Sequence, residues 1–491
     1  MQTITNSLVS TRAQPSEKAP NHRGAQWRTE VMGLITHVIP LASSVRPRGT
    51  WFLRGLVLSA GALSATPGSA QQATGSGPVP VVTLGEARQR ALQVDPNTVA
   101  ASQRIRVAGW ERRAATADLV APRLNGSLSY IRFSEPFFNF GTGSVSPNAA
   151  AASLEASYVI IGAGKLGNLK SARAALESAE ANETATRFQS ALATDAAYFA
   201  VLAERELARV ATDRVNRAQE QLGIARVRVS AGEAIASDSL QLVLELNRAR
   251  FFLLRQDSAL IASRYRLGSR IGLPGPAEAA PFDSAVPPPL PFTEEQATAE
   301  LRERGPDVEA ARADERRAES VLGAERERYL PAVTLSATTG AYDSELFPDA
   351  LRRSQLQIAL AFPFWDGGQR ELAVARLQAD RNVARANREQ RERSAAERIA
   401  QAYHGYGTAR AGIELARVGV VAATETYRVQ RARYGEGATT ILELLEAQVA
   451  LSEAEAALVQ ARFAARLALS QIEALLGRRV FEAGTSDRSN R

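Results

Sequence analysis

The stretch FPFWDGGQR (362–370) separates two different sequence patterns. The segment SQLQIALA before it alternates apolar and polar residues, as a β-strand does. The chain after it contains no proline and is rich in Ala, Arg, Glu and Leu, which favours a long helix. Pro363 suits a strand end, and Gly367 and Gly368 allow a sharp change of backbone direction. We expect Asp366 to accept hydrogen bonds from the free backbone N–H groups of the first helical turn.

The distribution of proline predicts two long helical regions. The chain has 22 prolines, yet none lies between Pro147 and Pro274 and none follows Pro363. Proline inside a helix costs about 3 kcal/mol, so these two stretches are expected to be helical. Each long helix would have about 65 residues and a length on the order of 100 Å. The proline-rich segment between the two regions reads as a linker.

The sequence predicts a duplication, with one repeat at 83–274, a linker at 275–292 and a second repeat at 293–477. Equivalent residues are separated by 210 positions for Pro96 and Pro306, and by 205 positions for Gly232 and Gly437. Each repeat is predicted to contain short helices, two strands, one long helix and one return helix. The expected strands are about 123–133, 152–161, 332–340 and 354–364; the expected long helices are about 165–230 and 369–434, and the return helices about 235–272 and 439–476.

The four strands are long enough to cross a bilayer when tilted. In the last strand, apolar Leu356, Ile358 and Leu360 share one face, and Gln355 and Gln357 share the other. This alternation is typical of membrane barrels, although a soluble sheet with one buried face alternates similarly. Four strands are too few for a closed barrel, so transmembrane strands would require the protein to oligomerise.

Aromatic residues cluster around these strands and suit an interfacial girdle. Of these, Phe137, Phe138 and Phe140 are predicted to lie in a loop rich in Pro, Gly and Asn. The cluster consists of Tyr130, Phe133, Phe137, Phe138, Phe140, Tyr158, Tyr342, Phe347, Phe362, Phe364 and Trp365.

The N-terminal 70 residues have the pattern of an extension followed by a secretory signal peptide. Arginines precede a short apolar stretch that ends in small residues, which predicts cleavage near Ala70. Residues 71–82 read as an N-terminal linker and 478–491 as a C-terminal tail. The mature protein is therefore expected to leave the cytoplasm.

Composition argues against several functional classes. The chain has no Cys and, after the signal peptide, one His at position 404, so Cys or His metal clusters and Ser-His-Asp triads are not expected. Residues 1–70 carry a net charge of +5 out of a total of +7, so the mature chain is nearly neutral and nucleic acid is not an expected partner. We find no catalytic set, metal site or phosphate-binding loop, and predict neither an enzyme nor a cofactor.

Residues 83–477 resemble the TolC-like outer membrane efflux proteins. The resemblance rests on the duplication, on Pro122 and Pro331 before strands, on FPFWDGGQR, and on the tips RVSAGEAIASDSLQLVLELNRA and RYGEGATTILELLEAQVALSEA. It implies a mainly α fold with a small membrane β-barrel contribution, four strands and four long helices per protomer. In such a homotrimer, a 12-stranded barrel in the outer membrane continues into a 12-helix periplasmic tube, with the Pro-rich linker at its equator.

The resemblance also implies a function. Such proteins are passive exit ducts for tripartite efflux or type I secretion, and their partners are a periplasmic adaptor and an inner membrane transporter. The cargo class stays open between drugs, metal ions and secreted proteins. The alternative is a soluble periplasmic coiled-coil scaffold without channel activity.

The resemblance assigns acidic residues to the periplasmic entrance. Glu443 and Glu446 match the acidic positions just past the second tip turn, and they lie three residues apart on one helix face. Asp238 is the counterpart in the first repeat. A solvated helix face is the alternative reading of these carboxylates.

The tip turns carry the remaining candidate site residues. Tyr434 matches a tyrosine that helps to hold the closed state, and Gly232 and Gly437 mark the tips that would contact an adaptor. The basic partner of that tyrosine in some family members is replaced by Thr439 here.

Overall fold

A computed structural model describes residues 79–139, 143–162, 164–281, 286–344 and 350–481, all of which belong to the unit Ser76–Arg491. The predicted signal peptide and its cleavage site lie outside the described residues, as do most of the C-terminal tail, Phe140 and Phe347.

The first repeat forms β1 and two short helices, then two strands and two long helices. These are β1 (Val81–Val82), α1 (Leu84–Val94), α2 (Pro96–Val120), β2 (Arg123–Asn139), β3 (Ser144–Ile161), α3 (Lys165–Ser230) and α4 (Ala236–Arg270).

The second repeat follows the same order after the two-residue strand β4 (Glu278–Ala279). It contains α5 (Glu294–Arg304), α6 (Pro306–Arg326), a 3₁₀ turn (Glu327–Tyr329), β5 (Ala332–Asp343), β6 (Leu351–Ala361), α7 (Gln369–Gly435) and α8 (Ile441–Leu476). Both repeats open with a capping box, in which Thr83 pairs with Glu86 and Thr293 pairs with Gln296.

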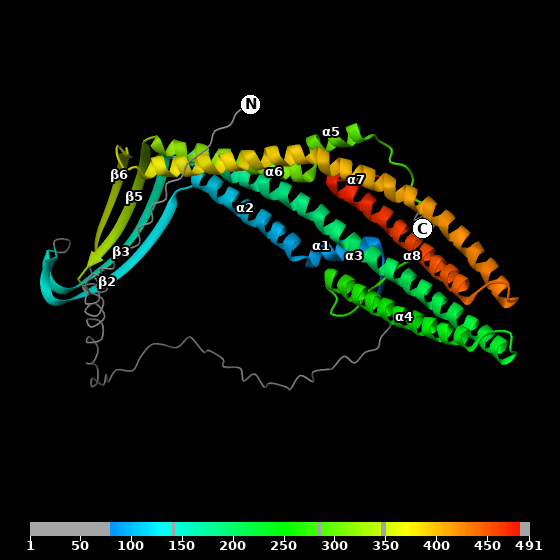
Figure 1. The fold of residues 1–491 in the computed structure, drawn as a ribbon. Coiled ribbons are helices and arrows are strands. Elements are labelled where there is room, and N and C mark those ends of the chain that lie inside the picture. Colours follow the sequence, from blue (N-terminus) through cyan, green and yellow to red (C-terminus); the bar gives the residue numbers. More distant parts are fainter. Residues whose placement is uncertain (1–78, 140–142, 163, 282–285, 345–349, 482–491) are drawn as a thin grey trace, which may run out of the picture. The chain divides into compact units, whose positions relative to one another are not determined.

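The four long strands form one antiparallel sheet in the order β2-β3-β5-β6. The sheet lies at the ends of α3 and α7 where these helices begin, and the helix–helix turns lie at their other ends (Figure 1). β2 and β6 occupy the two edges, and neither edge pairs with another described strand. The sheet therefore leaves two rows of backbone donors and acceptors available for pairing.

The β2–β3 hairpin is longer than the sequence suggested. The prediction that Phe137 and Phe138 lie in a loop is wrong, because both belong to β2, where Phe138 pairs with Val145. A register shift between Arg132 and Phe137 interrupts the ladder, and Phe133 and Phe137 then stack edge-to-face with ring centres 4.4 Å apart. Pairing across the hairpin overrides the turn-forming composition of this segment.

The strand-to-helix junctions depend on left-handed glycines. Gly164 and Gly368 both have φ of 81° and directly precede α3 and α7. The expectation that Asp366 caps α7 is wrong, because the N-cap is Gly368 and no side chain caps the helix. Asp366 instead accepts a hydrogen bond from Arg370 Nε at 2.8 Å. The left-handed pair Gly367–Gly368 lies between Asp366 and α7, and Asp366 bonds the side chain of Arg370 in the first turn rather than a backbone N–H.

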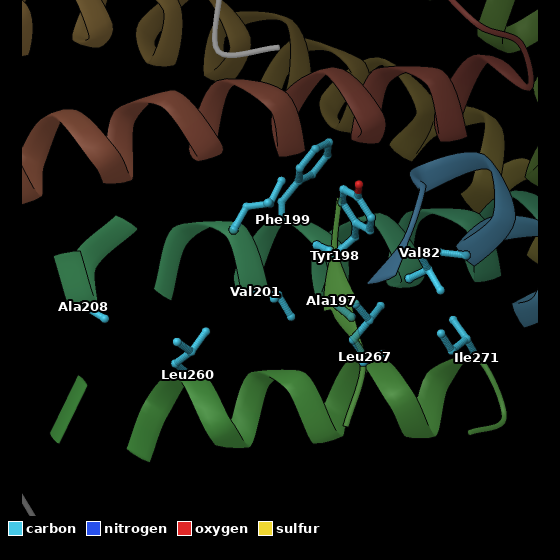
Figure 2. Packing of buried hydrophobic residues seen from close by; sticks show 13 residues of the cluster. Val82, Ala197, Tyr198, Phe199, Val201, Ala208, Leu260, Leu267 and Ile271 are labelled. Atoms are coloured by element: carbon cyan, nitrogen blue, oxygen red, sulfur yellow. The ribbon is translucent and has the colours of Figure 1, made fainter. Parts of the chain in front are cut away.

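The linker contributes the strand β4, which pairs in parallel with β1 from the N-terminal segment. This small ladder covers a cluster of buried residues on α3 and α4, including Tyr198, Val201 and Leu267 (Figure 2). Tyr198 donates a hydrogen bond from Oη to the carbonyl of Ala280 at 2.9 Å, so the linker is fastened to the long helix.

The described residues contain neither a membrane-spanning helix nor a cluster of metal-binding side chains. None of their helices combines the length and the apolar character needed to cross a bilayer. They also contain no group of three or more His, Asp or Glu side chains that could hold a metal ion.

Candidate entrance at the helix tips

Each repeat ends its long helix in a turn built around one glycine. Gly232 follows α3 with φ of 80°, and Gly437 follows α7 with φ of 76°, which is the conformation that glycine tolerates best. In the second tip, Thr440 caps α8 and accepts a hydrogen bond from the backbone N–H of Glu443 at 3.4 Å. No side chain caps α4 in the first tip. The Thr440 cap thus fixes the first turn of α8, which contains Glu443, to the second tip turn.

The two hairpins pack against each other through one buried cluster. It combines residues of all four long helices: Val215, Ala218, Leu222, Ala225, Leu242, Leu246, Ala249, Tyr427, Tyr434, Ile441, Leu444, Ala447 and Leu451. Within it, Gln221 Nε2 donates to Tyr427 Oη at 2.7 Å. Farther from the tips, Arg217 forms an ion pair with Glu455 at 2.9 Å. Separating the hairpins would expose this apolar surface and break these polar links.

Tyr434 lies at the contact between the tips and is 2% exposed. The guanidinium of Arg228, in the last turn of α3, lies 4.9 Å from the centre of the Tyr434 ring and donates a hydrogen bond to the Tyr434 carbonyl. Arg228 also donates to the carbonyl of Glu233 at 3.3 Å. Burial, reinforced by the charge of Asp238, raises the pKa of Tyr434. The tyrosine and Asp238 are therefore within electrostatic reach of each other.

Arg228 was not among the residues predicted from the sequence. At position 439, where the resemblance implied a basic residue in some family members, the chain has Thr, and Arg228 from the other repeat places a cation on Tyr434. The duplication could have pointed to Arg228 as a candidate, because Arg228 and Arg433 occupy equivalent positions 205 residues apart, each four residues before its tip glycine.

Glu443 and Glu446 are both exposed near the start of α8. Glu443 accepts a hydrogen bond from the hydroxyl of Thr439. Neither carboxylate forms an ion pair with a residue that the structure describes. Asp238 is half-buried in the first turn of α4. The second tip thus presents two carboxylates that have no ion-pair partner among the described residues. Pro363, Gly367 and Gly368 lie at the opposite end of α7.

The sequence profile of the outer membrane efflux protein family matches residues 87–272 and 298–478. The chain belongs to this family. The gap between the two matched blocks contains the proline-rich linker. The chain is 31% identical over 399 residues to the pyoverdine export outer membrane protein OpmQ of Pseudomonas aeruginosa, covering 77% of this chain and 81% of OpmQ. It is 27% identical over 181 residues to the outer membrane protein OprJ of the same species, covering 36% of this chain and 38% of OprJ.

Solved structures of outer membrane channels share the fold. The Campylobacter jejuni CmeC channel superposes with a TM-score of 0.70 at 17% identity, covering 80% of this chain and 85% of CmeC. The open state of the Neisseria gonorrhoeae MtrE channel gives 0.68 at 17% identity, covering 81% and 89%. The protein is therefore an outer membrane efflux protein. It is not an enzyme, and the soluble-scaffold alternative is not favoured.

Proposed function

We propose that three copies of this chain form a passive exit duct of a tripartite efflux or type I secretion system. The observation that carries this proposal is the four-stranded sheet with two unpaired edges. An open edge is not tolerated in lipid, so β6 of one copy would pair with β2 of the next. Three such sheets give 12 strands, which is above the minimum of about eight for a membrane barrel.

The helices support the same closure. α3 packs on α4 and on α8, and α8 packs on α7, so α4 and α7 lie at the two ends of the row. Both carry large exposed apolar residues at spacings of mostly three, four or seven. These are Leu240, Leu244, Phe251, Leu254, Ile261 and Tyr265 on α4, and Leu415, Val418 and Val421 on α7. Such stripes fit the packing of α4 from one protomer on α7 of its neighbour.

The tips form the periplasmic entrance in this proposal. Three copies of Glu443 and Glu446 surround the channel axis, and Tyr434 with Asp238 and Arg228 holds the hairpins together. The turns at Gly232 and Gly437 contact a periplasmic adaptor, which couples the duct to an inner membrane transporter. The similarity to OpmQ, a protein named for pyoverdine export, favours a small-molecule cargo.

Single-channel recording in planar bilayers tests the entrance. Converging carboxylates attract cations, so the wild-type pore should be cation-selective and divalent cations should block it. The double variant Glu443→Gln/Glu446→Gln should lose most of this selectivity and block while keeping its helix propensity. The difference in selectivity between the wild type and the double variant should shrink at 1 M salt, where the Debye length is about 3 Å.

Glu453→Gln provides the matched control. Glu453 is also an exposed glutamate of α8, and it lies ten residues beyond Glu443, about 15 Å along the helix. This variant should retain the wild-type selectivity. If the double variant also retained selectivity and divalent block, the two tip glutamates would be a solvated face and the entrance would lie elsewhere. Absence of any conductance from the wild-type trimer would remove the channel proposal itself.

A further inference from the structure

One face of β6 carries an arginine at its outer end. Leu356, Ile358 and Leu360 are 72%, 70% and 70% exposed and share this face by alternation. The ladder with β5 is regular from Tyr342–Leu351 to Ala332–Ala361, so Arg352 lies on the same face. Between Leu356 and Arg352 this face carries Ser354, whose hydroxyl is hydrogen-bonded to that of Thr339 at 3.0 Å, so the face becomes polar toward its outer end. Arg352 therefore belongs to the apolar face, whereas its neighbour Arg353 belongs to the opposite face.

The distances along β6 place Arg352 at the boundary of the hydrocarbon layer. Arg352 lies six residues from Ile358, about 20 Å along a strand. With a tilt of about 40°, this corresponds to roughly 15 Å along the membrane normal, or half of a hydrocarbon core about 30 Å thick. If Ile358 is near the midplane, the guanidinium of Arg352 lies at the level of the outer headgroups.

The two ends of this face differ in chemistry. The periplasmic end leads into α7 through Phe364 and Trp365, which are 86% and 78% exposed and suit an aromatic belt. The outer end has an arginine instead. An aromatic ring suits any membrane interface, whereas a guanidinium at the headgroup level is placed to pair with an anionic phosphate.

The strand β2 shows a second arginine in the same situation. Leu124, Leu128 and Tyr130 are exposed on one face, and the ladder with β3 keeps its register as far as Arg132 and its partner Asn148. Arg132 thus continues the apolar face at the outer end of β2. Neither Arg132 nor Arg352 forms an ion pair with another residue in the described part of the chain, and both are exposed.

We propose that Arg352 and Arg132 bind phosphate groups of lipids in the outer leaflet. Guanidinium pairs with phosphate through two parallel hydrogen bonds, and this geometry favours arginine over lysine. The inference rests on the barrel of the proposed function, because only that barrel turns the apolar face toward lipid. It adds a specific lipid contact that would fix the depth and orientation of the channel in the membrane.

Native mass spectrometry of the detergent-solubilised trimer with added lipid A tests this inference. The wild-type trimer should retain lipid A that carries two phosphates, and should retain dephosphorylated lipid A at least tenfold less. The double variant Arg352→Gln/Arg132→Gln should retain at least tenfold less of the phosphorylated lipid A than the wild type does. Arg353→Gln removes the same charge one residue away on the opposite face and should bind as the wild type does.

The competing outcomes are distinguishable. Displacement of lipid A by millimolar inorganic phosphate would show a free-phosphate site and overturn the lipid assignment. Equal lipid A binding by the wild type and the double variant would overturn the inference, and so would equal losses of binding in Arg353→Gln and the double variant. In either case, a trimeric mass and a measurable conductance would leave the proposed function intact. A chain that stays monomeric would overturn both.

Discussion

The two repeats solve the same packing problem with different chemistry. In repeat 1, the carboxylate of Asp95 accepts hydrogen bonds from Ser190 Oγ and forms an ion pair with Arg270, both at 2.7 Å. Asp95 is 4% exposed and Ser190 is 3% exposed. The residues that the repeat offsets of 210 and 205 place at the same positions in repeat 2 are Gly305, Ala395 and Leu475.

The backbone is nearly the same in both places. Asp95 has φ −62° and ψ 118°, and Gly305 has φ −60° and ψ 131°, and each precedes a proline that starts a helix. Ala395 is fully buried in an apolar cluster that Leu475 covers. The architecture therefore does not require the ion pair, which agrees with the general finding that apolar packing can replace buried ion pairs without loss of stability.

The largest effect is expected when the ion pair is broken from one side. Asp95→Ala leaves Arg270 without its partner and also removes the N-cap of α2. We expect a loss of about 3–5 kcal/mol of unfolding free energy, measured by denaturant titration of the purified protein. The triple variant Asp95→Gly, Ser190→Ala, Arg270→Leu, which copies repeat 2, should stay within about 1 kcal/mol of wild type. A triple variant as unstable as Asp95→Ala would show that the repeats are not interchangeable here.

The same comparison predicts a pH dependence. Burial opposes the ionisation of Asp95, but hydrogen bonds from Ser190 and Asn97 and the charge of Arg270 outweigh it and lower its pKa. A lowered folded-state pKa means that the ionised carboxylate stabilises the fold above its ordinary value of 3.8. This stabilisation should disappear as the pH falls through the lowered pKa. Below pH 4 the wild type should therefore lose more stability than the triple variant, and parallel pH curves would contradict this account.

The second strands of the repeats give the next effect. Leu154 of β3 and Ile358 of β6 are 52% and 70% exposed and belong to the apolar alternation. Arginine on the lipid face near the midplane costs about 2–4 kcal/mol, so Leu154→Arg and Ile358→Arg should both reduce trimer yield on a semi-native gel. Ala359→Arg, on the opposite face of β6, should assemble normally. Equal trimer yields for Ile358→Arg and Ala359→Arg would reverse our face assignment.

Local chemistry made some features predictable from the sequence. The starts of α3 at Lys165 and of α7 at Gln369 could be predicted from the proline-free stretches and from the glycines just before them, because these constraints act within a few residues. Non-local pairing hid others. The extension of β2 through Phe137 depends on β3, and β1 depends on a partner about 200 residues away in the linker.

The site was predictable only in part, for a similar reason. The tip glycines and the acidic positions follow from a short motif around the second turn, which the resemblance identifies. Arg228 contacts Tyr434 from the other repeat, 206 residues away, and no local pattern specifies that pair. Its repeat counterpart Arg433 does not reach across the tips, so symmetry alone would not have selected the right arginine.

The pair Arg228 and Arg433 provides the smallest and most specific test of the comparison. Both precede a tip glycine by four residues, but their contacts differ. Arg228 reaches the ring and carbonyl of Tyr434 in the other hairpin, whereas Arg433 donates within its own turn to Ala438 at 3.3 Å. A cation–π contact of this kind is worth about 1 kcal/mol, which corresponds to roughly a fivefold change in the equilibrium between closed and separated hairpins for each protomer.

Arg228→Ala should therefore favour separation of the hairpins, seen as a higher open probability in single-channel recordings. Arg433→Ala should change it less, and Arg228→Lys, which keeps the cation, should lie between Arg228→Ala and wild type. If Arg433→Ala opened the channel as much as Arg228→Ala, each arginine would act only on its own turn, and the cross-repeat contact would have no part in closing the entrance.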